Sequence, residues 1–210
     1  MKRKRLTREE SKELTRQRLV DAAQTIFIRN GYLATSVEDV AEAAGYTRGA
    51  FYSNFRDKGE LLMELLRRDH ARMQADLHSI IDDTATREEM EGRALTLYSR
   101  FFREDDCFLL WAEAKLLATR DAKFRVHFNA FSHEKREFLA GYIRLFSERV
   151  GAPLPLPAEV LALGLIGLCE GVHAFRLCDP QHVTDDLTEA VLAGFFAKVM
   201  FGGASGPGRT

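Results

Sequence analysis

A chain of 210 residues is long enough for one or two domains, and its 46% apolar composition is sufficient for a buried core. Its 30 Lys and Arg residues against 31 Asp and Glu residues exclude a disordered polyelectrolyte and a uniformly basic nucleic-acid coat protein. Three cysteines are too few for a disulfide scaffold, and the sequence shows neither a signal-peptide core nor an apolar run beyond ten residues. We therefore expect a cytoplasmic protein without a membrane span.

The charge is divided unequally along the chain. Residues 1–60 carry 12 Lys and Arg against 9 Asp and Glu, a balance of +3, and the remaining residues carry 18 against 22. Eight of the basic residues fall within the first eighteen positions. A positively charged amino-terminal region of this kind is typical of a nucleic-acid-binding module.

The first predicted helix ends at Asn30-Gly31. Before this dipeptide, apolar residues recur at the spacing of one helical face, at Leu19, Ala22, Ala23, Ile26 and Phe27. An Asn-Gly pair is also typical of a β-hairpin turn. Because the preceding period is 3.6 rather than 2, we interpret Asn30-Gly31 as a left-handed helix stop.

Capping patterns predict the next three helices. Ser36 to Asp39 resembles a capping box and opens a short helix that ends at Gly45. Thr47 is the N-cap of a third helix with the sequence RGAFYSNF. The segment from Asp57 to Glu60 opens a long helix, roughly 58–82.

The rest of the chain also predicts helices, and the first proline is at position 153. The predicted helices are about 86–103, 105–119, 121–150 (one helix or two, stopped by Gly151), 158–178 and 184–201. Residues 152–158 form a stiff connector, and residues 202–210 are predicted to be a disordered tail. The fold class is therefore all-α, with about nine helices.

Two short helices joined by Gly45-Tyr46-Thr47, with the small residues Ala41 and Ala44 where their axes approach, predict a helix-turn-helix. The segment VDAAQTIFIRNGYLATSVEDVAEAAGYTRGAFYSNFRDKGELLMELL resembles the amino-terminal domain of TetR-family (TetR/AcrR-like) transcriptional regulators, over about residues 14–66. This resemblance implies a DNA-binding domain over residues 1–60 and a larger helical domain for ligand binding and dimerisation over residues 61–201.

The predicted recognition helix supplies most of the candidate DNA contacts. Arg48 lies in its first turn, where a guanidinium can make a bidentate contact with guanine worth about 1–3 kcal/mol of discrimination. Gly49 allows a close approach of the bases, and Ala50 can contact a thymine methyl group. The resemblance implies that Thr47, Tyr52, Ser53 and Asn54 also face DNA. Thr35, Ser36 and Lys58 are expected to hold flanking phosphates.

Each of these residues also has a structural interpretation. Tyr52 can be a core aromatic with an exposed hydroxyl, and Ser36 is an N-cap whatever else it does. Arg48 and Lys58 can be solvated charges without a role in binding. The arm from Lys2 to Arg5 can be idle or can contact DNA, and the second case predicts a steeper salt dependence.

The larger region is rich in aromatic residues, which suits a mostly apolar pocket for a small-molecule effector. The residues predicted to line it are Phe102, Trp111, Phe128, Phe131, His173 and Phe175. The alternative is that these aromatics only fill the core of a helical bundle.

The last two helices are predicted to form a homodimer interface. One side consists of the glycines at 164, 167 and 171, and the other of Phe195, Phe196, Val199 and Met200. Such a dimer would place two recognition helices about 34–36 Å apart on a palindromic double-stranded DNA operator. A ligand that tilts the long fourth helix would spoil this spacing, which predicts a repressor that its effector releases.

Other classes of function find less support in the sequence. Nucleophile-elbow, phosphate-loop and zinc-protease motifs are absent, so we expect neither an enzyme nor a cofactor. Cys169 and His173, one helical turn apart, and nearby Cys178 leave open a metal-sensing repressor. A helical adaptor that does not bind DNA is disfavoured because Arg48, Tyr52 and Lys58 occur together.

Overall fold

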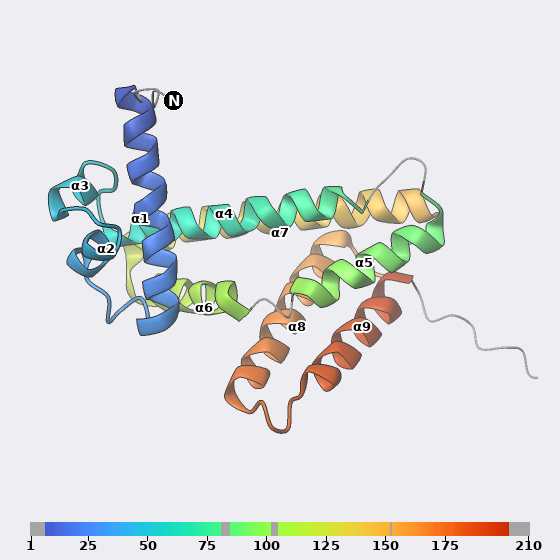
Figure 1. Cartoon of the computed structure of the whole chain (residues 1–210). Helices are drawn as coiled ribbons and strands as arrows, with labels where there is room; N and C mark the ends of the chain where they lie inside the picture. The colour runs from blue at the N-terminus through green and yellow to red at the C-terminus, as the bar shows by residue number, and fades with distance from the viewer. Residues whose placement is uncertain (1–6, 81–84, 102–104, 152, 202–210) are drawn as a thin grey trace, which may run out of the picture. The chain divides into compact units, whose positions relative to one another are not determined.

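The computed structural model describes residues 7–80, 85–101, 105–151 and 153–201. In these residues the chain forms nine helices and no strand (Figure 1). The helices are α1 (Arg8–Asn30), α2 (Val37–Ala43), α3 (Arg48–Tyr52), α4 (Lys58–His78), α5 (Arg87–Phe101), α6 (Asp105–Arg120), α7 (Ala122–Val150), α8 (Ala158–Cys178) and α9 (Asp185–Phe201). The predicted all-α fold class is confirmed.

Most predicted helix ends are confirmed because their signals are local. The Ser36 hydroxyl accepts the Asp39 N–H at 3.0 Å, and the Asp39 carboxylate accepts the Ser36 N–H at 2.8 Å, so this capping box opens α2. Thr47 caps α3 through the Ala50 N–H. Gly31 has a φ of 84°, a left-handed value that ends α1, and the chain does not form a hairpin there.

Two helices end earlier than predicted. The sequence predicts α3 to continue to residue 55, but it ends at Tyr52. The side chains of Ser53 and Asn54 donate to the carbonyls of Gly49 and Ala50 at 2.9 and 2.8 Å, which offers the last turn an alternative to further helical bonds. Helix α4 ends at His78 rather than near residue 82.

The chain divides into two compact units. The first unit comprises Met1–His70 and Leu109–Phe128, and the second comprises Ala71–Phe108 and Asn129–Thr210. The first unit therefore contains more than the predicted DNA-binding domain of residues 1–60, because parts of α4, α6 and α7 belong to it.

The first unit is built around the helix-turn-helix, in which α2 packs against both α1 and α3. Its largest fully buried side chains are Phe27, Phe51 and Phe55. Complete burial of each such side chain contributes roughly 1.5–3 kcal/mol. This core holds the backbone of α3 in place while one side of the helix remains exposed.

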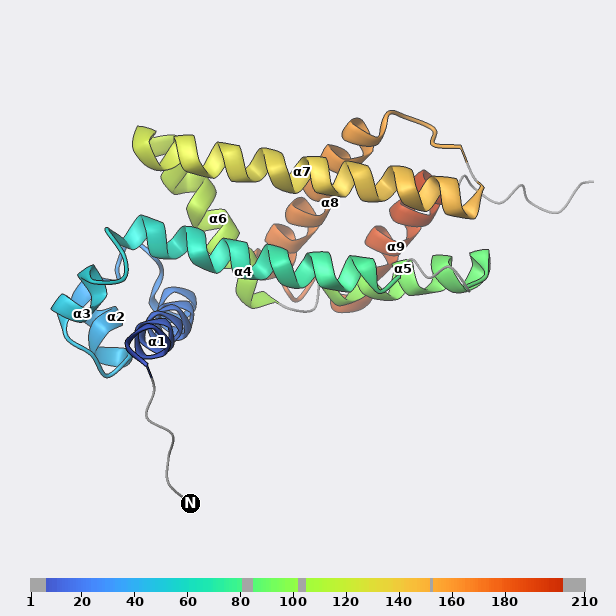
Figure 2. The ribbon, with the colours of Figure 1, turned by 90° about the horizontal axis from the view of Figure 1, so that it is seen from above.

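The second unit is a helical bundle in which α9 packs against α5 and α8 (Figure 2). Its core draws on distant parts of the sequence, including Leu77, Met90, Phe146, Leu161 and Phe196. Residues 122–150 form a single helix, α7, rather than two, and Gly151 follows it with a φ of 66°.

Helix α8 is apolar over a longer stretch than the ten-residue run on which the predicted absence of a membrane span was based. The longest apolar run in the sequence has ten residues, yet over an 18-residue window α8 reaches the length and composition of a membrane-spanning helix. A single helix of this kind is weak evidence for a membrane, because core helices of soluble proteins have the same composition.

Candidate nucleic-acid interface

Helix α3 has one buried and one exposed side. Phe51 points into the core of the first unit and is fully buried. Thr47, Arg48, Gly49, Tyr52 and Ser53 are exposed. Tyr52 is 48% exposed, and its ring contacts the edge of Phe51 at a centroid distance of 5.4 Å, so it covers the core from outside instead of filling it. The exposed side of α3 therefore brings together five of the ten predicted DNA contacts.

The guanidinium of Arg48 has two neighbours. Its Nη1 lies 2.9 Å from the carboxylate Oε1 of Glu38 on α2, and its Cζ lies 5.5 Å from the centroid of the Tyr52 ring. Both side chains of the ion pair are more than half exposed, at 65% and 53%. Glu38 and Tyr52 therefore orient the guanidinium of Arg48, which remains accessible to solvent. The sequence did not single out Glu38, because its partner lies on the next helix.

Asn54 has a structural position rather than an outward one. It is half-buried, and its amide donates to the Ala50 carbonyl at 2.8 Å. Its backbone carbonyl accepts a bond of 2.9 Å from Arg16 Nη1. These contacts argue against the implied contact between the Asn54 side chain and DNA. Ala50 is also half-buried, beside the exposed Gly49.

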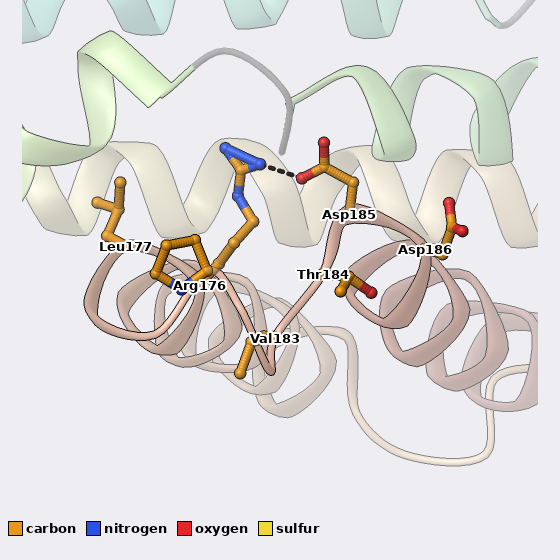
Figure 3. A pocket seen from close by; sticks show the side chains of 7 residues that line it. Arg176, Leu177, Val183, Thr184, Asp185 and Asp186 are labelled. Atoms are coloured by element: carbon orange, nitrogen blue, oxygen red, sulfur yellow. Dashed lines mark hydrogen bonds and ion pairs between the residues drawn. The ribbon is translucent and has the colours of Figure 1, made fainter.

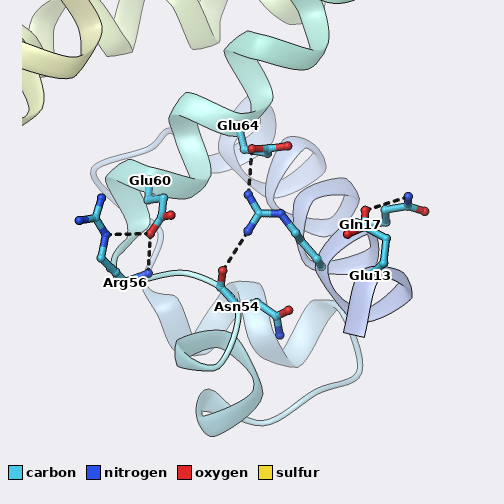
Figure 4. Close-up of polar contacts among 7 residues, drawn as sticks. Glu13, Gln17, Asn54, Arg56, Glu60 and Glu64 are labelled. Carbon is cyan, nitrogen blue, oxygen red and sulfur yellow. Dashed lines mark hydrogen bonds and ion pairs between the residues drawn. The ribbon is translucent and has the colours of Figure 1, made fainter. Parts of the chain in front are cut away.

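Arg16 was missed as a structural residue because the sequence shows only a basic position on α1. Its guanidinium bonds to the Asn54 carbonyl and to the Glu64 carboxylate, both at 2.9 Å (Figure 4). It also lies 4.2 Å above the ring of Phe55. One side chain thus connects α1, the end of α3 and α4.

The three residues expected to hold flanking phosphates already have partners inside the protein. Thr35 is 2% exposed, and its hydroxyl donates to the Gly31 carbonyl at 2.8 Å. The Ser36 hydroxyl is exposed and accepts the Asp39 N–H. This placement argues against a phosphate contact by the Thr35 hydroxyl, while Ser36 remains accessible from outside.

Lys58 is not a freely solvated charge, because its ammonium has partners inside the protein. Its ammonium donates to the backbone carbonyls of Tyr32 and Thr35 and lies 4.2 Å from the centroid of the Tyr32 ring. Partial burial lowers the pKa of Lys58, and the negative charges of Glu113 and Asp39 oppose this shift. Its main contacts therefore fix the loop between α1 and α2.

Glu113 completes the same cluster from α6. Its carboxylate accepts the backbone N–H of Tyr32, 81 positions away in the sequence. Burial, together with the charges of Asp57, Asp121 and Glu113, raises the pKa of Tyr32 to about 12. The loop before α2 is thus held by Lys58 and Glu113, and no periodicity in the sequence points to either contact.

The residues predicted to line an effector pocket are divided between the two units. Trp111 and Phe128 lie together in the first unit, with ring centroids 6.3 Å apart, and Trp111 Nε1 donates to Asp69 at 2.7 Å. In the second unit, Phe131 is buried, and the buried His173 stacks on Phe108 at a centroid distance of 4.7 Å. Phe102 lies outside the described residues.

Phe175 does not fit the predicted pocket, because it is 69% exposed. A cavity of about 520 Å³ at the turn between α8 and α9 contains none of the six predicted residues (Figure 3). An ion pair between Arg176 and Asp185 lies in its wall. The lining residues are Arg176, Leu177, Pro180, Val183, Thr184, Asp185 and Asp186.

Comparison with known proteins explains the geometry of the first unit. Residues 19–65, from α1 into α4, match the family model described as bacterial regulatory proteins, tetR family. This segment of the chain therefore has the sequence pattern of the TetR family. The predicted resemblance is therefore confirmed over these residues, and the curated proteins that match the chain are transcriptional regulators.

Sequence similarity to a known regulator covers less than half of this chain. The HTH-type transcriptional regulator TtgR of Pseudomonas putida is 39% identical over 87 residues, which cover 41% of this chain and 37% of TtgR. The match thus spans little more than a third of that relative.

Similarity of fold extends over most of the chain. A TetR-family regulator from Rhodococcus sp. has a TM-score of 0.73 at 23% identity, covering 90% of this chain and 99% of its own. A transcriptional regulator from Saccharomonospora viridis, solved in complex with choline, has a TM-score of 0.67 at 23% identity, with coverages of 88% and 96%. The helical fold of most of the chain is therefore shared with these two solved structures, although their sequences differ greatly from it.

Proposed function

We propose that this protein is a homodimeric repressor that binds a palindromic DNA operator through α3 and is released by a small, largely apolar or aromatic molecule. The observation that carries this proposal is the exposed side of α3. It presents Arg48 and Tyr52 to the outside, while Phe51 and Phe55 fix the helix from behind. A short rigid helix with an exposed arginine in its first turn suits readout of the major groove.

The glycine at position 49 supports the proposed contact between α3 and DNA. A Cβ atom built at this position would meet only the Thr47 hydroxyl, at an ordinary contact distance of 3.7 Å. Its φ is not in the left-handed region, so the fold does not require glycine there. The absence of a side chain instead leaves room for a base edge or a thymine methyl group close to the helix.

The dimer is supported by an exposed apolar face on α8. Val160, Leu163 and Phe175 are 51%, 59% and 69% exposed, and they recur at helical spacing with Gly164, Gly167 and Gly171. No atom lies within 4 Å of a Cβ built at any of these three glycines. On α9, Phe195 is 57% exposed, whereas Phe196 belongs to the buried core of the second unit.

A second copy of the chain is the occupant that fits this face. Small residues allow the backbones of two helices to approach closely, and exposed apolar patches of this kind mark interfaces. Such a dimer also provides the two recognition helices that a palindromic operator requires.

The effector is proposed from the second unit and from a structural neighbour. Helix α4 runs through both units, so a ligand that favours one position of α4 can alter operator affinity by a coupling of about 1–3 kcal/mol. The related structure from S. viridis holds choline, a small organic cation, which supports a small-molecule effector without indicating that this effector is apolar. The arm from Lys2 to Arg5 lies outside the described residues, and its contact with DNA stays a prediction.

The two alternatives have less support. In the part of the chain that the structure describes, no group of three His, Cys, Asp or Glu side chains is arranged to hold a metal ion. Within that part, His173 is buried against Phe108, while Cys178 is exposed. A helical adaptor that does not bind DNA would give no reason for an arginine, a glycine and a tyrosine to be exposed together on α3.

The test is selection of bound duplexes from a random DNA library by the full-length protein, with light scattering to measure its mass in solution. We expect an enriched palindrome and a mass of two chains. Loss of the enriched duplex in the presence of single compounds, drawn from a panel of apolar and aromatic molecules, identifies the effector. Failure to enrich any sequence contradicts the proposed function, and a monomer that binds a single half-site contradicts the proposed dimer.

A further inference from the structure

The helix-turn-helix is acidic although the region that contains it is basic. Residues 36–54 hold three acids, Glu38, Asp39 and Glu42, against a single base, Arg48, a balance of −2. Residues 1–35 hold nine Lys and Arg against four Asp and Glu. The charge that attracts a phosphate backbone therefore precedes the helix-turn-helix, and α2 itself repels phosphates.

One of these acids, Glu38, forms an ion pair with Arg48, the only Lys or Arg in residues 36–54. The Glu38 carboxylate lies 2.9 Å from Arg48 Nη1, and the guanidinium also faces the Tyr52 ring at 5.5 Å. An ion pair this exposed contributes little to the stability of the fold. Its effect is instead on what the guanidinium of Arg48 can bind.

We propose that Glu38 is a specificity-determining residue, which positions the Arg48 guanidinium and shields it from phosphates so that a guanine edge captures it in preference. This inference rests on the proposed binding of DNA through α3. A guanidinium has five N–H donors in a planar fork, so it can keep a carboxylate on one side while two other donors meet the O6 and N7 atoms of guanine. Glu38 thus leaves the base contact available.

The same carboxylate acts against non-cognate DNA. On such DNA no guanine is presented to Arg48, and the remaining acceptors are phosphates, which the negative charge of Glu38 repels. Specific binding therefore retains the arginine contact, whereas non-specific binding loses it. A charged partner that weakens the wrong complex more than the right one increases the ratio of the two affinities.

Glu38→Gln tests this role because glutamine keeps the length and an acceptor oxygen but removes the charge. We expect affinity for non-cognate duplex to rise about threefold to tenfold, while affinity for the selected duplex changes less than about twofold. The freed guanidinium neutralises about one more phosphate, so the salt dependence of non-cognate binding should become steeper by about 0.9 in log–log slope.

The experiment uses the full-length protein, the duplex that it selects from a random library, and a scrambled duplex of the same composition. Glu42→Gln is the matched control, since it removes the same charge from an exposed position one turn further along α2. Glu38→Gln is also measured in an Arg48→Ala background. Helical circular dichroism and melting verify that each variant is folded.

The inference is supported if Glu38→Gln lowers the affinity ratio at least threefold, Glu42→Gln leaves it within about twofold, and the effect disappears in the Arg48→Ala background. It is overturned if both glutamine variants lower the ratio equally, or if the effect persists without Arg48. A wild-type protein that selects no duplex overturns the proposed function itself, which distinguishes that failure from the failure of this inference.

Discussion

Each unit has an apolar core, and the two units differ in the contacts that accompany it. In the first, charged side chains bind backbone carbonyls far away in the sequence, as Arg16 does at Asn54 and Lys58 does at Tyr32 and Thr35. In the second, an apolar cluster around Ile143 and Phe146 joins α4, α5, α7, α8 and α9. Directional bonds need particular residue types, whereas apolar packing accepts many combinations of similar volume. This difference agrees with a family model that matches only residues 19–65, in the first unit, while similarity of fold covers most of the chain.

The largest expected effect tests whether the core of the second unit accepts another apolar side chain of similar volume. Phe146 is 2% exposed within the apolar cluster. Phe146→Ala should lower the free energy of unfolding by about 3–5 kcal/mol through lost burial and a cavity, whereas Phe146→Leu should cost about 1–1.5 kcal/mol. Urea unfolding followed by circular dichroism measures both values. Equal losses in the two variants would show that the second unit also needs a particular side chain.

The next prediction tests whether the first unit, unlike the second, requires a particular side chain. Arg16→Lys keeps the charge, but a lysine cannot reproduce the planar fork that bonds to Asn54 and Glu64 at once. We expect a loss of about 1–3 kcal/mol, because a half-buried carbonyl or carboxylate loses its partner. The same unfolding measurement applies, with Arg18→Lys on the same helix as the control. A loss below about 0.5 kcal/mol for Arg16→Lys contradicts the comparison.

Gly49→Ala separates stability from DNA binding within the first unit. The added methyl group meets only the Thr47 hydroxyl, and alanine is favoured over glycine in a helix, so the protein should gain up to about 1 kcal/mol of stability. Affinity for the selected operator should fall about tenfold, because the methyl group occupies space left for a base edge. Melting temperature and a gel shift provide the two measurements. Unchanged operator affinity would show that the bases do not approach this position closely.

The smallest effect concerns the alkaline limb of the stability curve. The pKa of Tyr32 is raised to about 12, above the ordinary tyrosine value of about 10. The unfolded chain therefore releases this proton first, and stability that is fully present below about pH 10 is lost as pH rises towards 12. Tyr32→Phe should flatten this loss, which urea unfolding at pH 9, 10 and 11 can detect. Ultraviolet titration of the phenols, compared between the two proteins, measures the pKa directly.

Local signals allowed much of the fold to be predicted. The capping box at Ser36 and Asp39 spans three residues, and Gly31 and Gly45 lie where the chain adopts a left-handed conformation. By contrast, the contact between Glu113 and Tyr32 joins positions 81 residues apart. Periodicity reveals which side of a helix is buried but not which distant polar group it meets, so the structural roles of Arg16, Lys58 and Glu113 were not predicted.

The same limit explains the outcome for the candidate effector residues. Their apolar character predicts burial, and Trp111, Phe128, Phe131 and His173 are buried. Composition does not indicate which of the two units each aromatic joins: Trp111 and Phe128 belong to the first unit, and His173 belongs to the second. Phe175 is exposed, since α8 carries apolar residues on its exposed side as well as on its buried side.

The exposed side of α3 has a consequence for how such a protein can diverge. Arg48, Gly49 and Tyr52 lie outside the buried core, while Phe51, Phe55 and Arg16 hold the helix from the other side. If α3 binds DNA as proposed, substitutions at these three outer positions can change the DNA sequence that the protein binds without unfolding it. A gene duplicate could acquire a new operator through a few such replacements, and the same three positions are the natural ones to randomise when a regulator with altered DNA preference is wanted.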